Sequence, residues 1–236
     1  MTILITGSSR GIGAALATQL AEEGHRLILV SRSEKELMKV CEQCNSIANN
    51  EIAVPLIYDL SKILDEIDEF QMKLTKLTST LDILVNNAGY LVRKPFAELS
   101  VMEARATFDV NYFVPAQLIK ICLPYLKASE SASIVNVTSM AAVQGSSKFP
   151  GLSAYSSSKG ALATLSECLA EEFKEMNIRV NALAFGAVQT EMLETAFPGL
   201  KASTSASEMA QFFKWFVLEG SKRFNGKMLP VSVSTP

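Results

Sequence analysis

The chain is poor in the residues from which metal centres are built. Its 236 residues include one histidine, His25, and only four cysteines. A structural zinc site needs four cysteine or histidine ligands, and Cys41-Glu42-Gln43-Cys44 has no second pair and no clustered histidines to complete one. We therefore predict no metal site and interpret all four cysteines as reduced, structural thiols: Cys41, Cys44, Cys122 and Cys168.

Charge is also scarce, and neither sign dominates. Charged residues make up 19% of the chain and the formal net charge is −2. This balance gives no reason to expect a nucleic acid or an anionic membrane as a partner. No apolar run approaches the length of a membrane span. The first predicted strand begins at Met1 or Thr2 and leaves no room for a targeting segment, so we expect a cytoplasmic location.

Short apolar runs alternate with amphipathic segments along the whole chain. The runs predict strands at 2–6, 26–30, 52–57, 81–85, 132–137, 178–184 and 227–231. The segments between them predict helices at 12–23, 34–48, 61–79, 98–110, 112–128, 154–176 and 207–219. This alternation predicts an α/β fold, a doubly wound parallel sheet of seven strands with helices on both faces. We expect one domain over 1–236.

A glycine-rich turn follows the first predicted strand. It reads Gly7-Ser8-Ser9-Arg10-Gly11-Ile12-Gly13 and leads into a helix-like segment. Glycines at these positions allow a tight turn and let backbone amides approach a pyrophosphate at the helix N-terminus. An ordinary strand-to-helix turn is the alternative, but the order of strand, glycines and helix indicates a dinucleotide site.

Tyr155 and Lys159 are four residues apart in a predicted helix, so their side chains share one face. A free tyrosine has a pKa near ~10 and is a poor acid or base at neutral pH. An ammonium close by favours the phenolate and lowers that pKa. The pair therefore predicts a catalytic acid or base, with accidental pairing on a surface helix as the alternative.

With these two motifs, the chain resembles the short-chain dehydrogenase/reductase family over nearly its whole length. Further matches follow in order: Asn86-Asn87-Ala88-Gly89 after the fourth strand, Asn111 in a central helix, Ser139 after the fifth strand, and Arg179-Val180-Asn181-Ala182 leading to Gly186 and Thr190. The resemblance implies a Rossmann-like sheet with strand order 3-2-1-4-5-6-7. It also implies a homo-oligomer, a tetramer or a dimer, built on the long helices at 98–128 and 154–176.

The resemblance also assigns a role to each candidate catalytic residue. Tyr155 is the general acid/base, and Lys159 lowers its pKa and holds the nicotinamide ribose. Ser139 orients the substrate oxygen, and Asn111 holds a water; capping a strand end or a helix is the alternative for these two. The implied cofactor contacts, besides Tyr155 and Lys159, are Gly7, Ser9, Arg10, Gly11, Ile12, Gly13, Ser31, Arg32, Asp59, Leu60, Asn87, Ala88, Gly89, Gly186, Val188 and Thr190.

The end of the second strand favours NADP over NAD. An acidic residue there would accept hydrogen bonds from the adenosine ribose of NAD, but the chain has Ser31-Arg32-Ser33. Arg32 and Arg10 can both pair with a 2′-phosphate and are similar to the basic pair of NADP-dependent family members. Either arginine alone could be a solvated surface charge. We predict that NADPH is preferred over NADH.

The resemblance implies an NADP(H)-dependent oxidoreductase that acts on a small carbonyl or alcohol. A 3-oxoacyl-carrier-protein reductase-like enzyme is the alternative, although the glutamates at 171–177 disfavour an acidic carrier. A non-catalytic nucleotide-sensing or scaffold protein is the second alternative. We expect the substrate pocket to draw on 90–94, 140–152 and 188–195, and we interpret 196–207 as a lid rather than a plain connection. These segments leave the substrate and the reaction direction open.

The chain departs from the family pattern at two places in its C-terminal part. Phe185-Gly186 stands where many relatives have Pro-Gly, so the turn lacks the fixed φ of proline. The tail from Met228 to Ser234 lacks the Asp-Gly-Gly found in many relatives. The altered tail bears on whether the assembly is a tetramer or a dimer.

Overall fold

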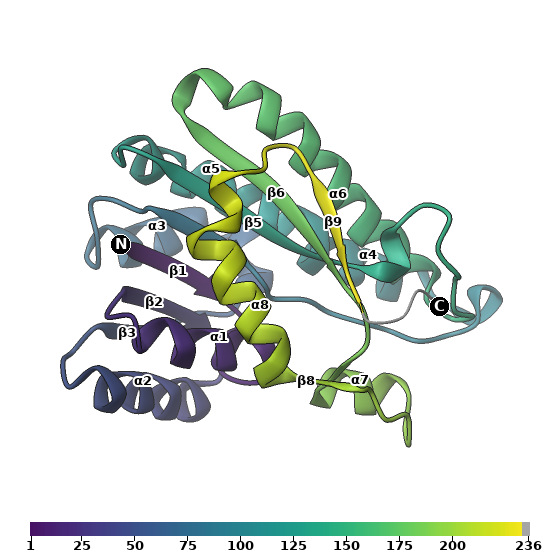
Figure 1. The fold of residues 1–236 in the computed structure, drawn as a ribbon. Helices are drawn as coiled ribbons and strands as arrows, with labels where there is room; N and C mark the ends of the chain where they lie inside the picture. Colours follow the sequence, from purple (N-terminus) through teal and green to yellow (C-terminus); the bar gives the residue numbers. More distant parts are fainter. Residues whose placement is uncertain (233–236) are drawn as a thin grey trace.

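The computed structural model describes residues 1–232, which are built around a parallel β-sheet. The strand order is β3-β2-β1-β4-β5-β6-β9, and every neighbouring pair is parallel. The strands are β1 Thr2–Thr6, β2 Arg26–Ser31, β3 Ala53–Ile57, β4 Ile83–Asn86, β5 Ala132–Ser139, β6 Ile178–Phe185 and β9 Met228–Val231. The order 3-2-1-4-5-6-7 is confirmed, with β9 as the seventh strand (Figure 1).

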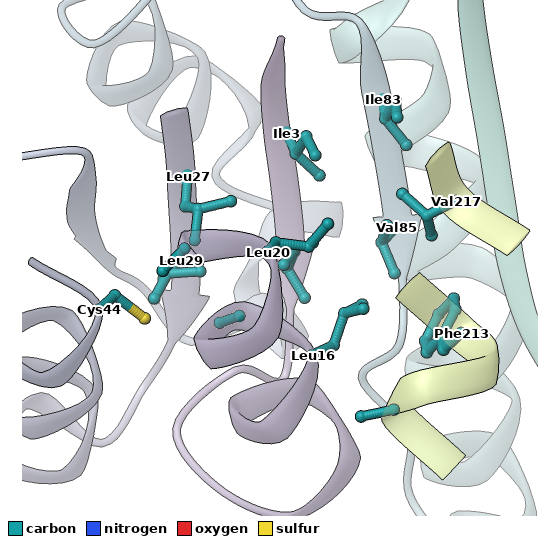
Figure 2. Close-up of a cluster of buried hydrophobic side chains, with 14 of the residues drawn as sticks. Ile3, Leu16, Leu20, Leu27, Leu29, Cys44, Ile83, Val85, Phe213 and Val217 are labelled. Atoms are coloured by element: carbon teal, nitrogen blue, oxygen red, sulfur yellow. The ribbon is translucent and has the colours of Figure 1, made fainter. Parts of the chain in front are cut away.

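Successive side chains on each strand point alternately into two separate cores, one on each face of the sheet. In β1, Ile3 and Ile5 belong to one cluster and Leu4 to the other, and all three are fully buried. The first cluster packs against α1 Gly11–Ala21, α2 Glu34–Ala48 and α8 Ala206–Leu218. Figure 2 shows its centre, where Leu16 of α1 and Phe213 of α8 meet the strands.

The second cluster lies under the helices of the opposite face. These are α3 Ile67–Thr75, α5 Val114–Lys127 and the C-terminal end of α6 Ser153–Glu172. A shorter helix, α4 Val101–Phe108, packs against α6. Helices therefore cover both faces of the parallel sheet, as the α/β pattern predicts (Figure 1).

Two predicted helical segments differ from the structure. The helix expected at 61–79 is divided into a 3₁₀ turn, η1 Leu60–Leu64, and α3, because the backbone of Glu66 leaves the helical region. The helices expected at 98–110 and 112–128 are instead joined by a π-turn, η3 Asp109–Phe113. There the Val114 N–H donates to the Asp109 carbonyl five residues back. Pro115 has no N–H, so the ordinary bond to Asn111 cannot form.

The stretch 196–207 is more structured than its composition suggests. It begins at the last residue of α7 Glu191–Ala196 and ends inside the start of α8. Between them, β8 Thr204–Ser205 pairs with β7 Val188–Gln189. Short 3₁₀ turns complete the described chain: η2 Phe96–Glu98, η4 Met140–Ala142, η5 Lys174–Met176 and η6 Gly220–Lys222.

None of the helices within residues 1–232 combines the length and the apolarity that crossing a membrane requires. The end of the tail, 233–236, lies outside the described residues. The expectation that the altered tail bears on the choice between a tetramer and a dimer rests partly on these residues.

The packing of the first core can be tested directly by truncating Phe213. Phe213 is fully buried, and its ring meets that of Phe185 edge-on at 5.2 Å between centroids. We expect Phe213→Ala to lower the free energy of unfolding by about 3–5 kcal/mol, because truncating a buried ring leaves a cavity. Gln211→Ala, at an exposed position of the same helix, should change it by less than about 0.5 kcal/mol. Equal effects in urea denaturation would contradict this arrangement.

Candidate active site

Most of the predicted site residues lie at or just beyond the carboxyl ends of the strands, whereas Asn111, Tyr155 and Lys159 are on helical segments. Strand order reverses between β1 and β4, whose loops leave the sheet beside each other. In parallel sheets such a switch point forms the crevice where ligands bind. The loops after β1, β2, β3, β4 and β6 carry the predicted cofactor residues, while Ser139 ends β5 and Tyr155 and Lys159 are on α6.

The glycine turn between β1 and α1 needs glycine for two different reasons. Gly7 and Gly11 have φ of +66° and +58°, in the left-handed region that other residues rarely adopt. Gly13 is required by space, because a Cβ there would lie 2.4 Å from the Gly7 carbonyl oxygen and 2.6 Å from Asn87 Nδ2. The glycines therefore let the turn pack closely against the loop after β4 at the start of α1, where a helix N-terminus favours a pyrophosphate.

A hydrogen-bonded junction fastens this turn to the loop after β4. The backbone N–H groups of Asn87 and Ala88 each donate to Thr6 Oγ1 at 3.0 Å. Asn87 Nδ2 donates in return to the carbonyls of Thr6 and Gly7, at 3.0 and 3.2 Å. Thr6 was not among the predicted site residues. Its place as the last residue of the strand, just before the glycines, was the available signal.

Asn111 is fully buried in the π-turn and clamps the loop after β4. Its Oδ1 accepts from the Tyr90 N–H at 2.8 Å, and its Nδ2 donates to the Tyr90 carbonyl at 2.8 Å. Nδ2 also donates to Ser158 Oγ at 3.0 Å, and Ser158 donates to the Tyr155 carbonyl at 2.8 Å. Asn111 thus connects the loop to the helix of Tyr155, and Ser158 is a link that the sequence analysis missed.

Lys159 is a buried cation without an acidic partner among residues 1–232. Its Nζ donates to the Val137 carbonyl at 2.8 Å. Desolvation lowers the pKa of Lys159 to about 8. A Cβ on Gly89 would lie 3.4 Å from this Nζ and 3.5 Å from Asn111 Oδ1, so glycine keeps the space beside both groups open.

The pKa of Tyr155 differs from the sequence-based expectation. Desolvation raises it, and a hydrogen bond with the Ser139 side chain only partly opposes this effect. The predicted lowering by Lys159 is wrong for this structure, because burial of the phenol dominates and the lysine bonds to Val137. Ser139 Oγ also accepts from the Ala141 N–H at 3.2 Å and caps the short turn after β5.

The predicted NADP-selecting residues lie beside the glycine turn but differ in their surroundings. Ser31 Oγ donates to Ser9 Oγ at 2.9 Å, which joins the end of β2 to the turn. Arg32 is exposed and forms no ion pair within the described residues. Arg10 pairs with Glu191 of α7 at 2.6 Å, a partner that the sequence analysis did not predict.

Several other predicted residues have structural partners in the protein. Asp59 Oδ1 accepts from the N–H and hydroxyl of Ser61, and so caps η1, which begins at the buried Leu60. Val188 is buried in the first core, and Thr190 caps α7 by accepting from the Leu193 N–H at 3.3 Å. A Cβ on Gly186 would meet Ser232 Oγ, so this turn needs glycine even with Phe185 in front of it.

Two of the segments predicted for the substrate pocket, 90–94 and 140–152, contact each other and the start of the predicted lid at 196–207. Arg93 Nη1 donates to the Ala196 carbonyl at 3.2 Å, and its guanidinium stacks over the Phe197 ring at 4.3 Å. Phe149 meets Phe197 edge-on at 5.9 Å. The Lys94 N–H donates to the Gly151 carbonyl at 2.9 Å. The segment after α7 is therefore tied to the two loops that face it.

Cys41, Cys44 and Cys122 are buried, as expected of structural thiols, whereas Cys168 is exposed on α6 and does not fit that interpretation. All four are free, and burial raises the pKa of Cys41 and Cys122 to about 12 and that of Cys44 to about 11. Within residues 1–232, no group of three or more histidine, cysteine or acidic side chains is arranged to hold a metal ion. The tight glycine turn at the start of α1 does fit a dinucleotide, because its left-handed glycines and helix N-terminus suit a pyrophosphate.

Comparison with known proteins agrees with this geometry. The family model described as short chain dehydrogenase matches residues 1–201. The ketoacyl reductase HetN of Nostoc sp. is 30% identical over 81% of this chain and 65% of its own length. Dehydrogenase/reductase SDR family member 7B of Xenopus tropicalis is 31% identical over 84% of this chain and 64% of its own. The matched region is thus less than two thirds of these two relatives.

Solved structures extend the likeness to almost all of the chain. A putative short chain dehydrogenase from Escherichia coli CFT073, complexed with NADPH, is 27% identical and covers 97% of this chain and 95% of its own, with a TM-score of 0.87. The glycine turn, the Asn87 junction and the Tyr155–Lys159 pair that suggested the resemblance lie together at one edge of the same fold. The chain belongs to the short-chain dehydrogenase/reductase family.

Proposed function

We propose that the protein is an NADP(H)-dependent oxidoreductase that interconverts a small carbonyl compound and its alcohol. The observation that carries this proposal is the buried, acid-free Lys159 on the helix of Tyr155, facing the gap that Gly89 leaves open. A buried cation is costly unless something compensates it, and the hydroxyl groups of a bound cofactor ribose would do so. Perturbed pKa values in one cleft are typical of catalytic groups.

The roles of the residues follow from their hydrogen bonds and pKa values. The bound nicotinamide supplies or accepts a hydride at the substrate carbon. Because the pKa of Tyr155 is raised, its phenol stays protonated near neutral pH and can donate a proton to the carbonyl oxygen during reduction. Ser139 can orient that oxygen, since its hydroxyl already bonds to Tyr155 and can stabilise developing negative charge.

Lys159 and Asn111 would help to move the proton that Tyr155 exchanges with the substrate oxygen. With a pKa of about 8, Lys159 can hold or release a proton near working pH. Hydrogen bonds from Asn111 hold the helix of Tyr155 next to the loop after β4. We propose that Asn111 also holds a water beside Lys159. In alcohol oxidation, Tyr155 would accept the alcohol proton while its own proton passes to neutral Lys159 and on to the water.

NADP is the proposed cofactor because the end of β2 carries Ser31 and Arg32 instead of an acid. A carboxylate there would repel a 2′-phosphate, whereas arginine can bind it in a bidentate manner. The similar Escherichia coli protein was solved with NADPH. Arg10 and Arg32 together would select the phosphorylated dinucleotide.

A 3-oxoacyl ester is the second candidate substrate, because the similar HetN is named a ketoacyl reductase. Against a carrier-bound form, the surface of 171–177 presents Glu171, Glu172 and Glu175, and its one lysine, Lys174, is paired with Glu171 at 3.4 Å. An acidic carrier protein would meet like charge there. We therefore rank a free carbonyl compound first. A nucleotide-sensing protein would bind NADPH without turnover.

We expect Tyr155→Phe to reduce turnover to below a few per cent of wild type while NADPH affinity stays nearly unchanged. The lost hydroxyl acts on the substrate oxygen and not on the dinucleotide. NADPH consumption with a panel of ketones and aldehydes measures turnover, and fluorescence titration measures affinity. Tyr58→Phe, whose hydroxyl donates to the Glu66 carbonyl near α3, is the control and should keep full turnover. Substantial turnover by Tyr155→Phe would exclude it as the acid.

The cofactor assignment predicts that Arg10→Ala combined with Arg32→Ala weakens NADPH binding and spares NADH. A hydrogen bond to a charged group contributes roughly 1.5–3 kcal/mol, so losing even one contact changes the dissociation constant about tenfold or more. Isothermal titration with each dinucleotide measures the two constants. An equal loss for both dinucleotides would show that the arginines do not read the 2′-phosphate.

We also propose a two-fold assembly of the helices at 98–128 and 154–176, as a tetramer or a dimer. Apolar side chains along this region are well exposed in the protomer: Phe96 at 80%, Val101 at 68% and Met102 at 71%. Large apolar side chains that are exposed this close together in the sequence favour an interface here. Light scattering at micromolar concentration should report a dimer or a tetramer, and Met102→Glu should shift it toward monomer. A monomeric wild type would contradict the assembly.

A further inference from the structure

The ion pair between Arg10 and Glu191 connects two elements that both belong to the site. Arg10 lies in the glycine turn, and Glu191 is the first residue of α7, 181 residues later. Their atoms Nη1 and Oε2 are 2.6 Å apart, and both side chains are about two thirds exposed, at 67% and 66%. The arginine expected to read a 2′-phosphate therefore already has an anionic partner.

The backbone around this ion pair brings Arg10 and Glu191 close together. Thr190 caps α7 and donates to the Val188 carbonyl at 3.2 Å, so the start of the helix is fixed to β7. A Cβ on Gly11 would lie 3.6 Å from Thr190 Cγ2, which shows that the start of α7 lies against the glycine turn. The fold therefore places the backbone of Glu191 beside the turn that carries Arg10.

The two arginines beside the predicted adenosine site are consequently not equivalent. Arg32 has no ion-pair partner within residues 1–232, whereas the charge of Arg10 is balanced by Glu191. A dianionic phosphate approaching Arg10 must either displace the carboxylate or bind beside it. Both routes cost free energy, the first through a lost ion pair and the second through like-charge repulsion. NADH has no 2′-phosphate and meets neither cost.

We propose that Glu191 is a specificity-determining residue that competes with the 2′-phosphate for Arg10 and so lowers the affinity for NADPH relative to NADH. The inference rests on the proposed function, because it requires that Arg10 reads this phosphate. Exposed ion pairs contribute little, so removing the competitor should strengthen NADPH binding by only about two- to fivefold. The same pair is screened by salt, and the gain should shrink as ionic strength rises.

The test is Glu191→Gln, which removes the charge and keeps the shape. Dissociation constants for NADPH and NADH are measured by fluorescence titration at low salt, without any substrate. We expect the constant for NADPH to fall about two- to fivefold and that for NADH to stay the same. Glu194→Gln, which removes a carboxylate from the same helix, is the matched control and should leave both constants unchanged. In an Arg10→Ala background, Glu191→Gln should no longer tighten NADPH binding.

Several results would overturn the inference. Weaker or unchanged NADPH binding by Glu191→Gln would show that the carboxylate orients Arg10 or does not compete. Glu191→Gln could instead tighten NADH binding equally, or still tighten NADPH binding in the Arg10→Ala background, or Glu194→Gln could tighten NADPH binding equally. Any of these results would show that the effect comes from the general loss of negative charge and not from competition for Arg10. These outcomes leave the proposed function intact if wild type binds NADPH and Arg10→Ala weakens it. A wild type that binds neither dinucleotide would overturn the inference and the proposed function together.

Discussion

The hydrogen-bonded junction between the ends of β1 and β4 is the constraint on which the site depends. Thr6 and Asn87 exchange hydrogen bonds across the switch point, and Gly13 must lack a side chain for Asn87 to reach the turn. This junction fixes the glycine turn at the start of α1 relative to Ala88 and Gly89. Because Gly89 faces Lys159 and the Asn111 side chain, the same contacts place the glycine turn next to the candidate catalytic groups.

Burial of Lys159 sets the electrostatics of that neighbourhood. Its pKa, lowered to about 8, lies below the value of an exposed lysine, so the folded state releases this proton first as pH rises. The charged lysine therefore costs stability below about pH 8, and the cost fades as pH rises from there toward the unfolded value. A site that carries such a cost without an internal acid is prepared for a negatively charged or strongly polar ligand group.

The fold and most site positions could be predicted from the sequence because they depend on local patterns. Short apolar runs located all seven strands, and the glycine turn indicated the cofactor turn through its spacing. The π-turn was missed because it requires a bond five residues back, which no helical periodicity encodes. The Arg10–Glu191 pair joins residues 181 positions apart, and the raised pKa of Tyr155 comes from tertiary burial. Such features appear only once the chain is folded.

The central claim is that this edge of the sheet brings a nicotinamide to a substrate carbonyl beside Tyr155. Label transfer tests it most directly: NADPH carrying deuterium at the reactive nicotinamide carbon is incubated with the wild-type protein and a panel of ketones and aldehydes. The account predicts an alcohol product that carries the deuterium on its former carbonyl carbon, detected by mass spectrometry. NADPH that binds tightly at the glycine turn, yet passes its label to none of these compounds, would contradict the account and favour a nucleotide-sensing protein.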